Sequence, residues 1–142
     1  MILIDANLLV YATHADTPFH TSARTWFEGR LSGTQPVGLP WAALLSFARL
    51  SCMRGVLERP LSPRDAWGAV TDWLDQPPTW IPQPTERHAD LVGRLLERET
   101  RADLIPHAHL AALGMEHGLT LCSADRDFGR FEGLRWENPL AE

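Results

Sequence analysis

The sequence predicts an α/β fold with a short parallel sheet, and three observations lead to this prediction. Residues 2–4 form a short apolar run and residues 119–122 a mostly apolar one, as is typical of strands that are buried on both faces. Segments with apolar residues at helical spacing lie between such runs. Strands that alternate with helices along a chain form a parallel sheet covered by helices. A length of 142 residues fits one domain, which we expect to span residues 1–142.

The expected strands and helices follow one another from the first residue to the last. Strands are expected at residues 2–4, 36–39, 119–122 and 134–136, with a shorter extended piece at 80–81. Helices are expected at residues 6–12, 19–31, 40–50, 66–74, 85–99 and 106–117. Pro40 and Pro63 favour helix starts, and Gly118 favours a helix end. Pro106 is expected to open the last helix, because the residue before a proline disfavours helical backbone. The pattern is compatible with strand order 3-2-1-4 but does not specify it.

Composition and charge narrow the possible functions. The formal net charge of −5 argues against a protein that coats nucleic acid by electrostatic attraction alone. All 13 basic residues are arginine, which suits bidentate phosphate contacts, although a genomic coding bias is the simpler explanation. Cys52 and Cys122 lie in apolar segments and are expected to be reduced. Because the sequence has no targeting signal and no apolar run of membrane-spanning length, we expect a cytoplasmic protein without membrane contact.

Three carboxylates follow predicted strands at the two ends of the chain. Asp5 comes directly after residues 2–4, and Asp125 and Asp127 follow residues 119–122. The carboxyl ends of parallel strands are where α/β proteins place their chemistry, so these acids are expected to meet. A cluster of carboxylates suits Mg²⁺ or Mn²⁺, and such a site activates water against a phosphodiester. The alternative is purely structural: a helix cap at Asp5, a turn residue at Asp125 and a helix start at Asp127.

Five segments resemble a known family. They are Met1-Ile-Leu-Ile-Asp-Ala-Asn-Leu-Leu-Val-Tyr-Ala12, Gly38-Leu-Pro-Trp41, Ala108-His-Leu-Ala-Ala-Leu113, Leu121-Cys-Ser-Ala-Asp-Arg-Asp-Phe128 and Gly133-Leu-Arg-Trp136. In this order and spacing they are similar to PIN-domain ribonucleases of the VapC type, the toxins of type II toxin–antitoxin pairs. The resemblance implies a PIN-like three-layer α/β/α sandwich with a short central parallel sheet. It also implies a Mg²⁺- or Mn²⁺-dependent endoribonuclease acting on structured RNA such as tRNA or rRNA. A cognate VapB-type antitoxin and a homodimer are the implied partners.

The resemblance also exposes two departures from the four acids of the family. The first acid corresponds to Asp5, and the fourth corresponds to Asp125 or Asp127. Ser46 stands where the family has a glutamate, and His107 stands where it has an aspartate. An imidazole suits Mn²⁺ or Zn²⁺ better than Mg²⁺. Three readings follow: a metal site of altered preference, a weakened nuclease, or a PIN module that binds RNA or antitoxin without turnover. An unrelated metal phosphoesterase of α/β type is a further alternative.

Two arginines and an asparagine complete the candidate site. Arg49 lies three residues after Ser46, on the same side of the predicted helix, and the resemblance also has an arginine there. We expect Arg49 and Arg126 to contact RNA, with a structural ion pair as the alternative for each. Asn7 is expected either to hydrogen-bond near the metal or to take an ordinary role at a helix start. His14 is expected at the surface or at an interface.

Overall fold

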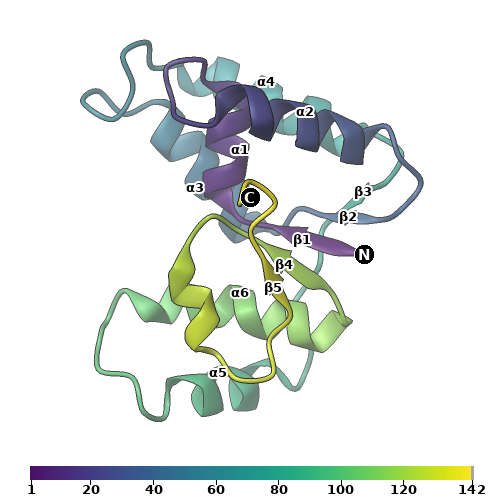
Figure 1. Ribbon diagram of the computed structural model, residues 1–142, viewed down its shortest axis with the longest axis vertical. Coiled ribbons are helices and arrows are strands. Elements are labelled where there is room, and N and C mark those ends of the chain that lie inside the picture. The colour runs from purple at the N-terminus through teal and green to yellow at the C-terminus, as the bar shows by residue number, and fades with distance from the viewer. Residues whose placement is uncertain (142) are drawn as a thin grey trace.

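The structure is a computed structural model that describes residues 1–141. Its centre is a parallel sheet of five strands in the order β3-β2-β1-β4-β5 (Figure 1). The strands are β1 (Ile2–Ile4), β2 (Val37–Gly38), β3 (Thr79–Trp80), β4 (Thr120–Cys122) and β5 (Trp136–Glu137). The order contains the compatible order 3-2-1-4 and adds β5 beside β4. The α/β class and the parallel sheet predicted from the sequence are therefore confirmed.

Helices cover both faces of the sheet. They are α1 (Ala6–Thr13), α2 (His20–Leu31), α3 (Trp41–Ser51), α4 (Pro63–Leu74), α5 (His88–Leu96) and α6 (Leu104–His117), with a 3₁₀ helix η1 (Arg126–Arg130). In Figure 1, α1 to α4 lie above the sheet, and α5, α6 and η1 lie below it. The chain thus forms the three layers of an α/β/α sandwich. No helix within residues 1–141 is long and apolar enough to cross a membrane.

The central strand β1 separates two hydrophobic cores. Ile2 and Ile4 belong to the core shared with α1 to α4. Leu3 belongs to the core formed by α6, β4 and η1. Successive strand residues point to opposite faces, so a strand with helices on both sides needs apolar residues at every position. This explains why the first strand is a continuous apolar run and why the sequence pattern located it correctly.

The last long helix starts two residues earlier than the proline pattern predicted. Helix α6 begins at Leu104 with Asp103 as its N-terminal flanking residue, so Ile105 is helical despite preceding Pro106. A proline in the first turn costs no hydrogen bond, because the N–H groups of that turn have no partner within the helix. Helix α5 is shorter than predicted and covers only His88–Leu96.

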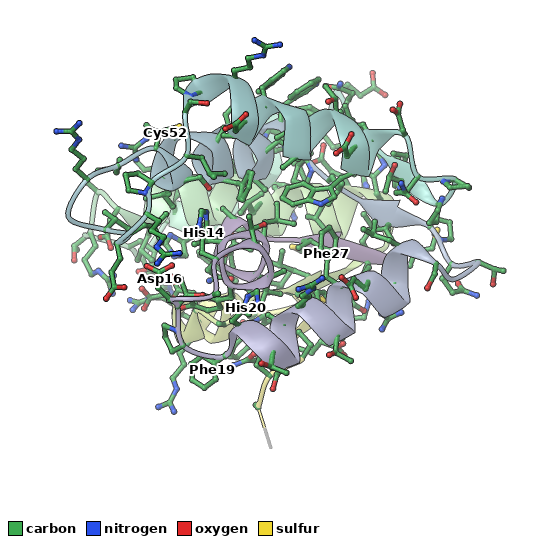
Figure 2. The ribbon with its side chains drawn as sticks, turned by 90° about the horizontal axis from the view of Figure 1, so that it is seen from above. His14, Asp16, Phe19, His20, Phe27 and Cys52 are labelled. Atoms are coloured by element: carbon green, nitrogen blue, oxygen red, sulfur yellow. The ribbon has the colours of Figure 1, made fainter. Side chains whose placement is uncertain are left out.

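The loop between α1 and α2 also differs from the sequence-based expectation. His14 was expected at the surface or at an interface but is buried within the chain, and its Nε2 lies 2.9 Å from the hydroxyl of Ser51. Figure 2 looks down on α1 and shows His14 on the side of this helix away from α2. Phe19 was expected within the second helix, yet it precedes that helix with a φ of 65° and a side chain that is 58% exposed. The amphipathic spacing therefore located α2 but not its start.

Candidate metal centre

The candidate site forms where two neighbouring strands end. Strands β1 and β4 pair in parallel, with Ile4 opposite Cys122. The chain therefore leaves the sheet at two adjacent points, with Asp5 after β1 and Ser123 to Asp127 after β4. His107 enters from the first turns of α6, which packs against β4 and η1. The topology thus brings Asp5, the turn after β4 and the start of α6 to the carboxyl ends of β1 and β4. Asp5, Asp125 and Asp127 were expected at this place.

Ser123 holds the two strand ends together. Its buried hydroxyl donates to Asp5 Oδ2 at 2.7 Å and accepts from the side-chain amide of Asn7 at 3.1 Å. It also accepts from the backbone N–H of Asp125 at 3.0 Å. One hydroxyl proton and two lone pairs are then fully used. Ser123 was not among the residues predicted for the site. The available signal was a small hydroxyl side chain directly after a predicted strand and two residues before an acid.

Asp5 caps helix α1 and also lies in the candidate site. Its Oδ1 accepts from the backbone N–H of Ala6 at 2.7 Å, so it caps α1 as in the structural alternative. Burial raises the pKa of Asp5, and hydrogen bonds from Ser123 and Ala6 act in the opposite direction. Charges on His107 and Asp125 also influence its pKa, which places Asp5 within electrostatic range of both. Capping a helix therefore does not remove Asp5 from the candidate site.

His107 and Asp125 form an ion pair at the centre of the site. Nε2 of His107 donates to Asp125 Oδ2 at 2.7 Å, and Nδ1 donates to the carbonyl of Asp103 at 2.9 Å. A carbonyl and a carboxylate are both acceptors, so this geometry suits the doubly protonated ring, the imidazolium. Burial lowers the pKa of His107, but the bonds to Asp125 and to the Asp103 carbonyl outweigh it and leave this pKa above its ordinary value.

Asp127 is paired with an arginine that the sequence analysis did not single out. Nη1 and Nη2 of Arg101 donate to the two oxygens of Asp127 at 3.2 and 2.9 Å. Arg130 lies farther away, with Nη1 3.9 Å from Asp127 Oδ1. The hydrogen bonds from Arg101 lower the pKa of Asp127. Arg101 precedes α6 in a loop with no recognisable motif, so no sequence pattern pointed to this contact.

Three side chains converge closely enough to share a cation. One ligand atom each from His107, Asp125 and Asp127 lies within 4.8 Å of the other two. An imidazole nitrogen and two carboxylates fit a divalent ion, and this donor set favours Mn²⁺ over Mg²⁺. Asp5 is not a member of this group of three, but the charges of His107 and Asp125 act on it. Loss of the His107 proton would be needed before its Nε2 could bind a metal.

Of the remaining candidate residues, only Asn7 is tied to this centre by hydrogen bonds within residues 1–141. Asn7 contacts the turn after β4, because its Oδ1 accepts from the N–H of Ala124 at 3.3 Å. Ser46 is half-buried on α3 and makes no hydrogen bond to the cluster within residues 1–141. Arg49 and Arg126 are exposed, and neither joins an ion pair in the described part of the chain. The structure thus gives no support to the ion-pair alternative for these two arginines.

Comparisons with known proteins agree with the fold and the motifs. The chain is 44% identical over 142 residues to ribonuclease VapC37 of Mycobacterium tuberculosis, covering 99% of each chain. It is 40% identical over 141 residues to ribonuclease VapC43 of the same species, covering 99% of this chain and 96% of the relative. No family model matches the sequence.

Solved structures share the fold at low sequence identity. The crystal structure of VapBC2 from Rickettsia felis, bound to a DNA fragment from the promoter, aligns with a TM-score of 0.70 at 16% identity. That alignment covers 97% of this chain and 98% of the other. FitAcB from Neisseria gonorrhoeae aligns with a TM-score of 0.64 at 14% identity over 98% of both chains. Taken with the full-length identity to the mycobacterial relatives, these matches show that the chain belongs to the VapC ribonuclease family and has its PIN-like fold.

Proposed function

We propose that the chain is the toxin of a type II toxin–antitoxin pair and a metal-dependent endoribonuclease that cleaves structured RNA such as tRNA or rRNA. The convergence of His107, Asp125 and Asp127 beside Asp5 is the observation that carries this proposal. The names of the relatives, which are ribonucleases, support the reaction class. The fold contributes the placement of these side chains at the carboxyl edge of a parallel sheet.

A divalent ion, Mn²⁺ or Mg²⁺, would be held by His107, Asp125 and Asp127, with Asp5 beside them. Such an ion supplies Lewis-acid activation of water and neutralises charge at the phosphodiester. The protein's own residues fix the ligands: Ser123 orients Asp5 and the turn of Asp125, and Asn7 ties that turn to α1. Ligands held by surrounding hydrogen bonds stay in place when the cation is absent.

RNA contact would come from local positive charge, because the whole chain is acidic. Arg49 and Arg126 are exposed and free of ion pairs within residues 1–141, so both guanidinium groups are available for phosphate oxygens. Their contacts would position the strand without selecting a sequence.

The proposed partners follow from the family. Solved neighbours are complexes, VapBC2 and FitAB, each described as bound to DNA. We propose a VapB-type antitoxin as the partner of this chain, and a homodimer of the toxin within that complex. A cytoplasmic location is consistent with this role.

One observation favours the alternative of a weakened or inactive PIN module that binds RNA or antitoxin without turnover. Asp125 is already paired with the His107 imidazolium, and Asp127 is already paired with Arg101. A metal must therefore displace a proton and compete with a guanidinium before both carboxylates can serve as ligands. The proton must be displaced because His107 stands where the family has an aspartate.

The test is RNA cleavage by the antitoxin-free chain on tRNA and rRNA with Mn²⁺ or Mg²⁺. We expect Mn²⁺-dependent cleavage that falls by roughly 10- to 100-fold in Asp125→Asn. The matched control is Asp90→Asn, which neutralises an exposed acid on α5 outside the site. His107→Asp should raise the Mg²⁺-dependent rate by roughly tenfold, because it removes the imidazolium and adds a hard oxygen ligand.

Each contrary result identifies another function. If neither the wild type nor His107→Asp cuts RNA with any divalent ion, the chain is a binding module. If a generic phosphodiester is hydrolysed and RNA is not, the chain is a metal phosphoesterase.

A further inference from the structure

Arg101 occupies a position that the proposed function does not use. It lies in the loop between α5 and α6, and its guanidinium bridges two carboxylates. Towards the site it is bidentate to Asp127, with distances of 3.2 and 2.9 Å. On the other side its Nε and Nη2 donate to Asp103 at 3.1 and 2.6 Å. The planar fork of arginine matches a carboxylate in this geometry, so each pairing has a defined orientation.

From this geometry we infer that Arg101 is an internal counter-ion that competes with the divalent cation for Asp127. This inference rests on the metal centre proposed above. The Asp127 carboxylate that Arg101 engages is the same one that lies within 4.8 Å of ligand atoms of His107 and Asp125. A divalent ion bound there would share that carboxylate with a guanidinium, and the two cations would repel each other. Arg101 therefore lowers the affinity of the site for metal.

Asp103 provides a second carboxylate that would keep Arg101 paired when Asp127 binds a metal. When Asp127 turns to a metal, Arg101 keeps its two hydrogen bonds to Asp103, so no guanidinium is left unpaired. Its side chain is 45% exposed, which leaves water available for the remaining N–H groups. Arg130 does not take over this role, because its nearest atom is 3.9 Å from Asp127 and Glu99 holds it with two hydrogen bonds.

The loop of Arg101 also touches the other ion pair of the site. The carbonyl of Asp103 accepts from Nδ1 of His107 at 2.9 Å. One short segment at the start of α6 thus positions both internal cations, Arg101 and the imidazolium. Arg101 is therefore a positioning residue that sets the affinity of the site for metal. Its bonds to Asp127 also hold the α5–α6 loop against η1.

Isothermal titration of Mn²⁺ into the antitoxin-free chain tests this inference. We expect Arg101→Gln to bind Mn²⁺ about two- to fivefold more tightly than the wild type, the range of an exposed ion pair. Arg98→Gln is the matched control, because it removes one exposed arginine near the same loop that has no ion pair within residues 1–141. Arg101→Lys keeps the charge but not the bidentate fork, so its affinity should lie between those of the wild type and Arg101→Gln.

A structural role alone predicts different results. If Arg101 only held the loop, Arg101→Gln would bind Mn²⁺ no more tightly than Arg98→Gln, and that result would overturn the inference. Circular dichroism identifies an unfolded variant, in which case the comparison of Arg101→Lys with the wild type decides. Tighter Mn²⁺ binding without RNA cleavage would leave the inference standing and remove the proposed nuclease function. RNA cleavage by the wild type, together with an unchanged Mn²⁺ affinity in Arg101→Gln, would overturn the inference and leave the proposed nuclease function standing.

Discussion

At the scale of single residues, the hydroxyl of Ser123 connects the segments that follow β1 and β4. It joins Asp5, Asn7 and the backbone of Asp125 through three hydrogen bonds while fully buried. Ser123→Ala would leave a carboxylate and an amide without this partner. We expect the free energy of unfolding to fall by roughly 2–4 kcal/mol, since a hydrogen bond to a charged group is worth more than an average one. Urea denaturation followed by circular dichroism measures this change.

Ser32→Ala is the matched control for this prediction. Its exposed hydroxyl bonds only to carbonyls of its own helix, those of Glu28 and Gly29. We expect a change within about 0.5 kcal/mol, as for surface positions in general. Equal losses for the two variants would mean that Ser123 does not join the two strand ends energetically.

At the scale of elements, α1 is fixed at its far end by a buried histidine. Burial lowers the pKa of His14, whose Nε2 lies 2.9 Å from the hydroxyl of Ser51 on α3. The unfolded chain therefore binds a proton at this residue at a higher pH than the folded chain does. Stability consequently falls as the pH drops below about 6.5. Thermal unfolding between pH 5 and 7 should show a shallower pH dependence for His14→Gln than for the wild type, and an identical dependence would contradict this role.

The elements also show what a sequence can and cannot predict here. Continuous apolar runs located β1 and β4, because a strand buried on both faces has no polar positions. The same strands led us to expect Asp5, Asp125 and Asp127 at one place, and in the structure Ser123 links Asp5 to the backbone of Asp125. The start of α6 was missed, since Pro106 fits the first turn as well as the first position. Arg101 could not be predicted, because its role depends on a contact between the α5–α6 loop and η1 that no periodic pattern marks. Ser123 was missed although it follows a predicted strand directly and precedes an acid by two residues.

At the scale of the whole molecule, the proposed RNA substrate would have to be bound through a few local charges, because the chain has a net charge of −5. Each phosphate contact releases about 0.7 counter-ions from single-stranded RNA, so affinity should depend on salt in proportion to the number of contacts. If Arg49 and Arg126 each bind one phosphate, the double variant Arg49→Gln/Arg126→Gln should bind RNA more weakly for every sequence. Its plot of log affinity against log salt should be less steep by about 1.4.

This experiment uses Asp125→Asn as the parent and EDTA in place of a divalent ion, so that binding is measured without turnover. Arg24→Gln serves as the control, because Arg24 is exposed on α2 and already paired with Glu28 at 2.8 Å. Its salt dependence should match that of the parent. If the double variant keeps the full slope, RNA lies on another face of the molecule. The positive charge that offsets the acidic surface would then have to come from arginines outside α3 and η1.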